Sequence, residues 1–277
     1  MADYLVFMDI DGTLIDNQQQ VQPITQSVIR LLTQKNVQFY IATGRMYQSA
    51  AIVRESLTPS MGIVASNGSV YSMADQIVKH HLAPEVIPTI IELCTAHSVN
   101  GFFFGTQKVY YTQQLPDYFK QSDQNRIASG QPDDYVQLTA GNLTPEIVAD
   151  IINGIIIEDQ DLTKLTPIRE QLGVLEGLTI STSNPNNIEL IPEGISKASA
   201  IQAIQETLQI DQQHTFAFGD GMNDAPMFTV ADLSVAMGNA QPAVKEAARY
   251  QTNANNEDGI GRFLADYFNL KETDYHA

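Results

Sequence analysis

Continuous apolar runs alternate with segments of helical period along the first third of the chain. Residues 4–9 and 37–42 are predicted strands, and the continuous apolar run over 4–8 is expected of a strand that is buried on both faces. Between them, residues 24–35 repeat apolar side chains at the spacing of an amphipathic helix. A second helix is predicted over residues 46–57 and a third strand over residues 63–65. This alternation predicts a parallel sheet whose strands are joined by crossover helices.

The pattern changes near Pro84 and returns at Ser196. Between these positions we expect helices over 85–97 and 162–172, a loop over 129–134, and strands over 101–104, 109–111, 155–157, 175–182 and 187–191. From Ser196 onward the expected helices are 196–208, 223–230, 241–248 and 257–269, and the expected strands are 214–219 and 233–236. The two ends of the chain therefore share one kind of architecture, and the middle has another.

The simplest fold is an α/β core with a doubly wound parallel sheet, formed by both ends of the chain and interrupted by an inserted α+β domain. We place the core at residues 1–82 and 185–277 and the insert at residues 83–184. About 100 residues suffice for a domain of its own. The insert is therefore expected to fold as a separate domain.

Composition and charge narrow the partners that the chain can have. Hydrophobic residues make up 43% and charged residues 17% of its 277 positions, as in soluble globular proteins. The formal charge of −17 opposes binding to nucleic acid or to an anionic membrane, so we expect neither partner. No stretch reaches the roughly 18 apolar residues of a membrane span, and no signal peptide is visible. Cys94 is the single cysteine, which excludes an internal disulfide and favours a cytoplasmic setting.

Two aspartates, Asp9 and Asp11, follow the first apolar run and precede a glycine. Open parallel sheets bind ligands beyond the carboxyl ends of their strands, which is where this pair falls. Because alternate residues of a strand share a face, both carboxylates are expected to point the same way. One could attack a substrate while the other moves protons. Taken alone, the pair fits solvated acids in a turn equally well.

Two further clusters lie at strand–helix junctions of the predicted core. Thr43, Gly44 and Arg45 end the second strand, where a hydroxyl and loop amides can hold an anionic oxygen. Lys197 begins a helix, where a cation opposes the helix dipole unless it has an anionic partner. Taken singly, the first cluster also fits an ordinary helix start, and the lysine also fits a solvated surface position.

A third cluster, Asp220, Asn223 and Asp224, follows the strand predicted over 214–219. Mg²⁺ prefers oxygen ligands, usually one or two carboxylates with waters and a substrate phosphate. Asp9 and Asp220, at neighbouring strand ends, would supply such a pair. A solvated acidic turn explains this cluster alone, but it does not explain why all the clusters fall at junctions of one core.

With these residues in this order, the chain resembles the haloacid dehalogenase superfamily of phosphatases. The matching motifs are Asp9-x-Asp11-Gly-Thr, Thr43-Gly-Arg45, Lys197 and Gly219-Asp220-Gly-x-Asn223-Asp224. The insert resembles the α/β cap of that superfamily's class IIB. Similarity to the Cof-type subfamily of sugar- and metabolite-phosphate phosphatases rests on Ser66-Asn67-Gly68 and on the segments 235–240 and 257–259. Ala198, where the family commonly has glycine, departs from the pattern and affects helix packing more than chemistry.

The resemblance implies a reaction through an aspartyl-phosphate. Asp9 would attack phosphorus as the nucleophile. Asp11 would protonate the leaving oxygen and then deprotonate the water that hydrolyses the intermediate. Mg²⁺ would be held by Asp9, Asp220 and the backbone carbonyl of Asp11, and Asp224 would support this metal site directly or through its neighbours.

The resemblance also implies a set of donors to the phosphoryl oxygens, where charge must be balanced. These donors are the side chains of Thr43, Lys197 and Asn223 and the backbone amides of Ile10 and Gly44. Thr43 and Lys197 thereby count among the catalytic residues. Arg45 and Asn67 are candidates for contact with the substrate or the cap, although Arg45 has the alternative role of holding its own loop.

The implied activity is Mg²⁺-dependent hydrolysis of small phosphorylated metabolites, with a cap that closes about hinges near 82–84 and 183–186. A sugar phosphomutase with the same nucleophile is the alternative, and a catalytically silent binding module is favoured less. A dehalogenase would have no use for Asp11, Asp220 and Asp224 together.

The substrate is open, because the cap loops, including 113–134, carry no readable motif. Sugar phosphates, phosphorylated cofactors and nucleotides all fit. The oligomeric state is open between monomer and dimer.

Overall fold

The computed structural model describes residues 2–73, 76–106, 108–115, 135–139, 141–182 and 184–275. The chain divides into two compact units, residues 1–78 with 195–277 and residues 79–194. Both ends of the chain thus contribute to the first unit. The boundaries that the sequence predicts, at 82/83 and 184/185, stay a prediction.

The first unit is built on an eight-stranded sheet. Its strands, in sheet order, are β14 (Tyr250–Gln251), β13 (Leu233–Ala236), β12 (Thr215–Gly219), β1 (Tyr4–Met8), β2 (Val37–Ala42), β3 (Gly62–Ala65), β4 (Val70–Met73) and β5 (Gln76–Lys79). Neighbouring strands from β14 to β3 run parallel, and β4 pairs with β3 in the antiparallel direction. The order reverses direction at β1, so the sheet is doubly wound as predicted.

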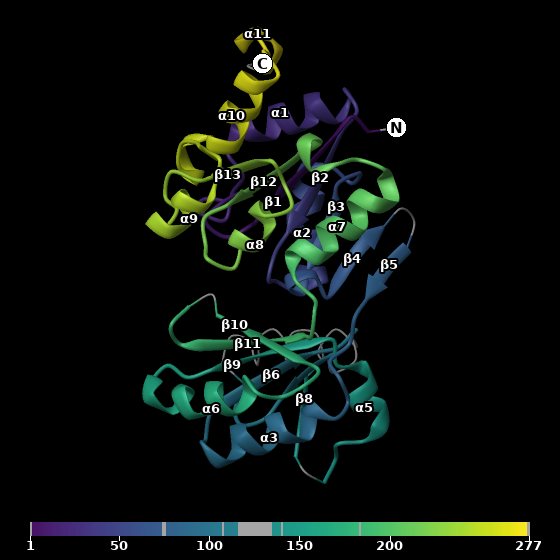
Figure 1. Cartoon of the computed structure of the whole chain (residues 1–277), viewed down its shortest axis with the longest axis vertical. Helices are drawn as coiled ribbons and strands as arrows, with labels where there is room; N and C mark the ends of the chain where they lie inside the picture. Colours follow the sequence, from purple (N-terminus) through teal and green to yellow (C-terminus); the bar gives the residue numbers. More distant parts are fainter. Residues whose placement is uncertain are drawn as a thin grey trace, which may run out of the picture. The chain divides into compact units, whose positions relative to one another are not determined.

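Helices connect these strands and pack on the sheet. The α-helices are α1 (Pro23–Thr33), α2 (Tyr47–Leu57), α7 (Lys197–Leu208), α8 (Ala225–Phe228), α9 (Pro242–Ala247), α10 (Gly259–Tyr267) and α11 (Glu272–Tyr275), and the 3-10 helices are η1 (Ser66–Gly68), η3 (Gln212–His214) and η4 (Asn255–Glu257). Helix α1 packs beside α10 and α11, and α7 packs beside α8 (Figure 1). The layer that contains α1, α10 and α11 therefore combines segments from both ends of the chain.

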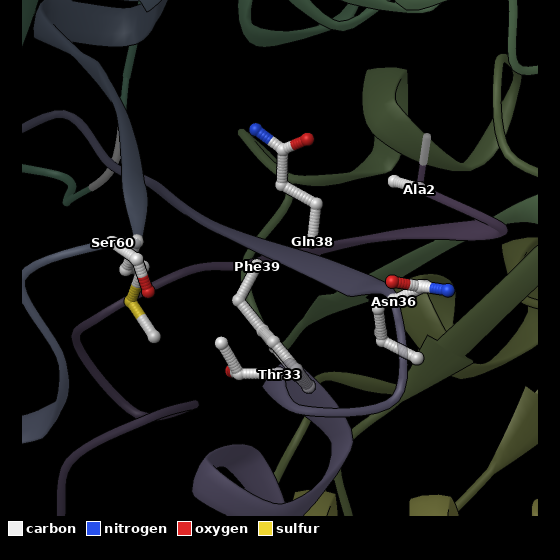
Figure 2. A pocket seen from close by; sticks show the side chains of 8 residues that line it. Ala2, Thr33, Asn36, Gln38, Phe39 and Ser60 are labelled. Atoms are coloured by element: carbon white, nitrogen blue, oxygen red, sulfur yellow. The ribbon is translucent and has the colours of Figure 1, made fainter.

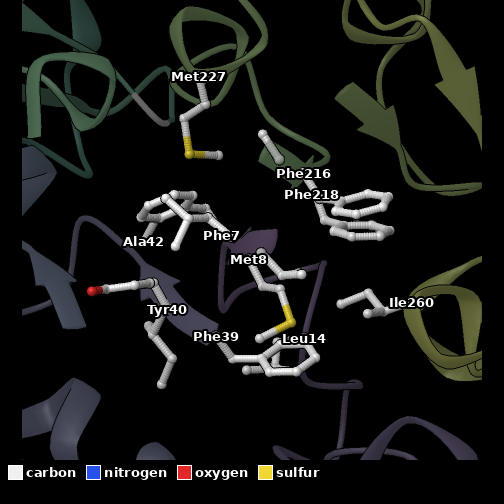
Figure 3. Close-up of a cluster of buried hydrophobic side chains, with 14 of the residues drawn as sticks. Phe7, Met8, Leu14, Phe39, Tyr40, Ala42, Phe216, Phe218, Met227 and Ile260 are labelled. Carbon is white, nitrogen blue, oxygen red and sulfur yellow. The ribbon is translucent and has the colours of Figure 1, made fainter. Parts of the chain in front are cut away.

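Buried aromatic side chains fill the core of this unit (Figure 3). Phe7 stacks on Tyr40 with ring centroids 4.9 Å apart, and Phe216 stacks on Phe218 at 6.3 Å. Burial of each large apolar side chain contributes about 1.5–3 kcal/mol. The apolar side chains of β1 are buried in this core, and β1 pairs with β2 along one edge and with β12 along the other, which fixes the position of the residues that follow it.

The second unit contains a six-stranded mixed sheet. Its strands, in sheet order, are β10 (Leu178–Ser181), β11 (Asn187–Pro192), β9 (Asn153–Ile157), β6 (Asn100–Phe104), β7 (Val109–Tyr111) and β8 (Tyr135–Gln137). Its helices are α3 (Val86–Ala96), α5 (Pro145–Asp150), η2 (Leu162–Lys164) and α6 (Leu165–Leu172). Figure 1 shows α3 and α6 on one face of this sheet, where they enclose an apolar core around Phe103 and Ile156.

The α/β class and the inserted mixed sheet are as predicted, but several elements were missed. The sequence analysis gives no strand for β4, β5, β8 or β14 and no helix for α5 or α11. These elements are six residues or shorter, so their apolar periodicity is too brief to read. The expected loop 129–134 lies outside the described residues. Among the described helices, none has the length and hydropathy that crossing a bilayer requires.

Candidate active site

The buried carboxylate of Asp9 lies directly after β1 in the middle of the first sheet. Its backbone N–H donates to the carbonyl of Phe218 on β12, 3.1 Å away, which continues the pairing of the two strands. Asp9 is 6% exposed, and its Oδ1 accepts from Lys197 Nζ at 2.7 Å. A buried carboxylate requires such a partner, because desolvation of an unpaired charge costs several kcal/mol.

Lys197 joins two carboxylates. The lysine is 2% exposed, and its Nζ also donates to Asp224 Oδ1 at 2.7 Å. Ser196 caps helix α7 by accepting from the N–H of Ser199, which fixes Lys197 at the first helical position. Lys197 therefore has two anionic partners, Asp9 and Asp224, which offset the unfavourable position of a cation at a helix start.

The loop after β12 holds the carboxylates of Asp220 and Asp224 in defined positions. Asp224 Oδ2 accepts from the backbone N–H groups of Asp220 and Gly221, both at 3.0 Å. Asp220 Oδ1 accepts from the hydroxyl of Thr13 at 2.8 Å. Gly12 approaches Asp220 so closely, with a left-handed φ of +78°, that a side chain at this position would strike the carboxylate.

Three of these carboxylates form a group that fits a divalent cation. Asp9, Asp220 and Asp224, here called the acidic triad, place one ligand atom each within 4.8 Å of one another. Closely spaced carboxylate oxygens are the donors that a hard cation prefers. Lys197 supplies one positive charge for three carboxylates, so two negative charges are left for a cation to balance.

Burial and neighbouring charges raise the pKa values of Asp9 and Asp220, two members of the acidic triad. Burial raises the pKa of Asp9, the charge of Asp224 adds to the rise, and Lys197 opposes it. Burial also raises the pKa of Asp220 to about 6, against the hydrogen bond from Thr13. Burial by itself lowers the pKa of Lys197, but the charges of Asp224 and Asp9 outweigh it and raise the value. A bound cation would offset the repulsion between these neighbouring carboxylates.

Asp11 has surroundings different from those of Asp9. Its side chain is 56% exposed and forms a two-point ion pair with Arg45, in which Nε donates to Oδ2 at 2.8 Å. Arg45 Nη2 also donates to Gln19 Oε1 at 2.9 Å. Strand β1 ends at Met8, so the alternation used to align Asp9 with Asp11 does not extend to these residues. The turn at Gly12, rather than the strand, sets the direction of Asp11.

Hydrogen bonds connect the loop after β2 with the start of η1. Asn67 N–H donates to the Thr43 carbonyl at 3.0 Å, and Arg45 N–H donates to the Thr43 hydroxyl oxygen at 3.1 Å. Gly44 lies against the Asn67 amide, where an added Cβ would come within 3.3 Å of Oδ1. Asn67 thus supports the Thr43 loop from the side.

Backbone amides near the acidic triad are available as donors. Within the described residues, the N–H groups of Ile10 and Gly44 donate no hydrogen bond. The side chain of Ile10 is buried in the core, which leaves its amide at the strand end. Asn223 stands in the loop between Asp220 and Asp224, and its Oδ1 lies beside Gly221.

The sequence analysis assigned no role to several residues that build this site. Thr13 binds Asp220, Gln19 binds Arg45, and Asn239 Nδ2 donates to the Gly12 carbonyl at 2.7 Å. Asn255 N–H in turn donates to Asn239 Oδ1 at 3.0 Å. Thr13 and Asn239 lie inside motifs that the sequence analysis quoted, so their positions carried a signal. Gln19 stands in a polar turn that has no motif.

Comparison with known proteins identifies the relatives of this arrangement. Residues 6–264 match the family model described as haloacid dehalogenase-like hydrolase. The chain is 31% identical over 262 residues to the 5-amino-6-(5-phospho-D-ribitylamino)uracil phosphatase YcsE of Bacillus subtilis, covering 94% of each chain. It is 27% identical over 279 residues to a second such phosphatase of Bacillus subtilis, YitU, covering 96% of this chain and 98% of the relative.

A solved structure has the same fold. The HAD subclass IIB sugar phosphatase BT4131 superposes with a TM-score of 0.77 at 22% sequence identity, covering 97% of this chain and all of that one. At this identity the likeness concerns the fold, including the inserted mixed sheet.

Proposed function

Because this chain belongs to the haloacid dehalogenase-like hydrolase family, in its Cof-type branch, and is a phosphatase of small phosphorylated metabolites, we propose that Asp9 is its nucleophile. The observation that carries the proposal is the position of Asp9, which is buried at a strand end, paired with Lys197 and part of the acidic triad. One oxygen of Asp9 accepts from Lys197, and the other is the candidate to form the bond to phosphorus.

In the first step, an Asp9 oxygen bonds to phosphorus while the ester P–O bond breaks, and Asp11 gives a proton to the leaving oxygen. In the second step, a water oxygen attacks phosphorus, Asp11 takes the water proton, and the Asp9–phosphorus bond breaks. Arg45 competes with the substrate for Asp11. The ion pair between Arg45 and Asp11 must therefore open in each turnover.

Mg²⁺ is the proposed cation, held by Asp9, Asp220 and the backbone carbonyl of Asp11; when bound, it balances charge on the phosphoryl oxygens. Both oxygens of Asp224 already accept hydrogen bonds, from Lys197 and from the amides of Asp220 and Gly221. This supports a role for Asp224 in positioning Lys197 and the Asp220 loop rather than as the main metal ligand.

The phosphoryl oxygens would be held by Thr43, Asn223, Lys197 and the amides of Ile10 and Gly44. The amides of Ile10 and Gly44 have no other acceptor among the described residues. The Thr43 hydroxyl accepts from Arg45 N–H and keeps its own proton to donate. Pre-oriented donors of this kind provide the charge stabilisation on which phosphoryl transfer depends.

For the substrate, we propose phosphorylated ribitylaminopyrimidines as the first candidates, in line with the activity named for both Bacillus relatives, and sugar phosphates as the second. The leaving-group contacts are assigned to the inserted domain, proposed as a cap over residues 83–184. Of its proposed specificity loop, residues 116–134 lie outside the described residues. The same holds for Ser183 in the second proposed hinge.

The test is phosphate release from a panel of these metabolites, with and without Mg²⁺, by the wild type and by Asp9→Asn. Turnover should depend on Mg²⁺ and should fall at least about 10³-fold in the variant. Asp266→Asn, which removes an exposed carboxylate from α10, is the matched control and should retain full activity. A tenth of wild-type turnover remaining in Asp9→Asn would exclude Asp9 as the nucleophile. Phosphate transfer between sugars without release would indicate the phosphomutase instead.

A further inference from the structure

The first unit has a pocket of about 390 Å³ whose lining includes no residue of the acidic triad. Residues of β2, α2, the loop before β3, β4 and β5 line it, and none of them belongs to the proposed active site. We call it the Arg54 pocket, after the charged residue among the described residues of its lining. Its volume falls in the range of small-molecule sites.

In the described part of the chain, the guanidinium of Arg54 lacks a protein partner, and its Nε is buried. Its side chain makes neither an ion pair nor a hydrogen bond with the described residues. A buried donor without a partner costs about 1–3 kcal/mol, and more when it is charged. Every other arginine side chain in the described part of the chain donates at least one hydrogen bond, so Arg54 is an exception. An acceptor supplied by a ligand would resolve the cost.

The rest of the lining is also suited to an acceptor. Among the described residues, no Asp or Glu lines the pocket. The Tyr40 hydroxyl oxygen accepts from Gln38 Nε2 at 2.8 Å, so its proton is free to be donated. Burial raises the pKa of Tyr40 to about 12, and the phenol therefore keeps this proton at neutral pH. Arg54 and Tyr40 together offer donors and no negative charge.

The pocket has an apolar side as well. Tyr47 and Arg54 are seven residues apart on α2, two turns along one face of the helix. Ile77 on β5 is 50% exposed and lines the same hollow. The anionic group of a ligand could bind at the polar end of the pocket, and a ring or short chain of the same ligand could pack against its apolar side.

The neighbouring hollow differs in its lining. It has a volume of about 250 Å³ and shares Gln38, Ser60 and Met61 with the Arg54 pocket. Figure 2 shows Gln38 and Phe39 extending from β2 to opposite sides. No charged residue is among its described lining, so an anion has no counter-ion there. The charge of Arg54 therefore directs a ligand head to the larger hollow.

We propose that the Arg54 pocket is a second ligand site, which binds a small organic carboxylate. The carboxylate would accept from Arg54 and from the Tyr40 hydroxyl, while the remainder of the ligand packs beside Tyr47 and Ile77. A guanidinium matches a carboxylate in charge and in its two-point geometry. One arginine would leave a phosphate dianion half neutralised, which favours the carboxylate.

Benzoate is the probe, and its uncharged analogue benzamide tests the need for charge. Binding is measured by ligand-observed NMR titration of the full chain, with Mg²⁺ and inorganic phosphate present throughout to occupy the acidic site. The variants are Arg54→Met, Arg54→Lys and, as a matched control, Arg249→Met, which removes an exposed guanidinium outside the pocket. Unchanged melting temperatures establish that each variant is folded.

Benzoate should bind the wild type saturably and bind Arg54→Met about tenfold more weakly, since a charge-assisted hydrogen bond is lost. Arg249→Met should match the wild type, and benzamide should bind the wild type about tenfold more weakly than benzoate does. Arg54→Lys keeps the charge, so its affinity for benzoate should lie between those of the wild type and Arg54→Met. Equal affinities for wild type and Arg54→Met, or no saturation at tens of millimolar benzoate, would overturn the proposal. Phosphatase activity does not enter this readout, so the two proposals can fail separately.

Discussion

The two units of this chain differ in what their buried interiors contain. The first unit has a buried cluster of one lysine and several carboxylates at the ends of its parallel strands. The second unit has an apolar core around Phe103 and Ile156. Buried charge is costly to maintain, whereas apolar burial stabilises a fold directly. The first interior therefore indicates chemistry, and the second indicates a scaffold.

Lys197→Met gives the largest expected effect, because it removes the positive charge from the buried cluster. Asp9 and Asp224 would each lose their partner, and breaking a buried pair in this way costs about 3–5 kcal/mol. Turnover should fall at least about 10³-fold, since the phosphoryl charge loses a donor. Urea unfolding and phosphate release measure the two effects.

Lys35→Met is the matched control for this variant, because Lys35 is exposed and lies outside the site. It should change neither stability nor turnover. If Lys197→Met proved as stable as Lys35→Met, the buried cluster would not have the electrostatic importance assigned to it.

Ile156→Ala tests the scaffold of the second unit. Ile156 is fully buried on β9, and truncation of such a side chain costs about 2–5 kcal/mol. The rise in melting temperature that Mg²⁺ causes should nevertheless stay as in the wild type, because every residue of the acidic triad belongs to the first unit. Thermal unfolding with and without Mg²⁺ measures both quantities. A lost Mg²⁺ response in this variant would contradict the separation of the two interiors.

Removal of the metal should change the stability of the first unit alone. Mg²⁺ at a hundred times its dissociation constant should stabilise the protein by about 2.7 kcal/mol, and EDTA should reverse this. Asp220→Asn should lose most of the response, because it removes a carboxylate of the acidic triad. Asp232→Asn, on the loop before β13, is the control and should retain it. An equal Mg²⁺ response in Asp220→Asn would place the cation elsewhere.

The sequence predicted the charged cluster of the first unit better than it predicted the short elements of either unit. Asp9, Lys197 and Asp224 could be singled out because a lysine at a helix start needs an anionic partner and because the clusters all fall at strand–helix junctions of one core. The structure links the three side chains by hydrogen bonds. The ion pair between Arg45 and Asp11 could not be predicted from strand alternation, because it depends on the turn at Gly12. In the second unit, β8 and α5 were missed because short elements are fixed by tertiary contacts that leave no periodic trace.

The smallest predicted effect concerns an ion pair at the end of β9. Glu158 accepts from Lys164 Nζ at 2.9 Å and from the N–H groups of Gln160 and Asp161 at 2.8 and 3.1 Å. The hydrogen bond from Lys164 comes first among the causes that lower the pKa of Glu158. A lowered pKa means that the ionised group stabilises the folded state above its ordinary pKa and that this contribution is lost as the pH falls through the lowered value.

Glu158→Gln should therefore lower the stability at pH 7 and reduce its decline as the pH falls from about 5 towards 3. Glu170→Gln, at an exposed position on α6, is the matched control and should leave the pH dependence as in the wild type. Urea unfolding across this pH range measures the difference. A wild-type slope in Glu158→Gln would show that the pair with Lys164, whose lysine is partly exposed, contributes nothing to the folded state. The ion pairs of the first unit and this pair of the second would then differ in what they contribute, which would make the contrast between the two units sharper.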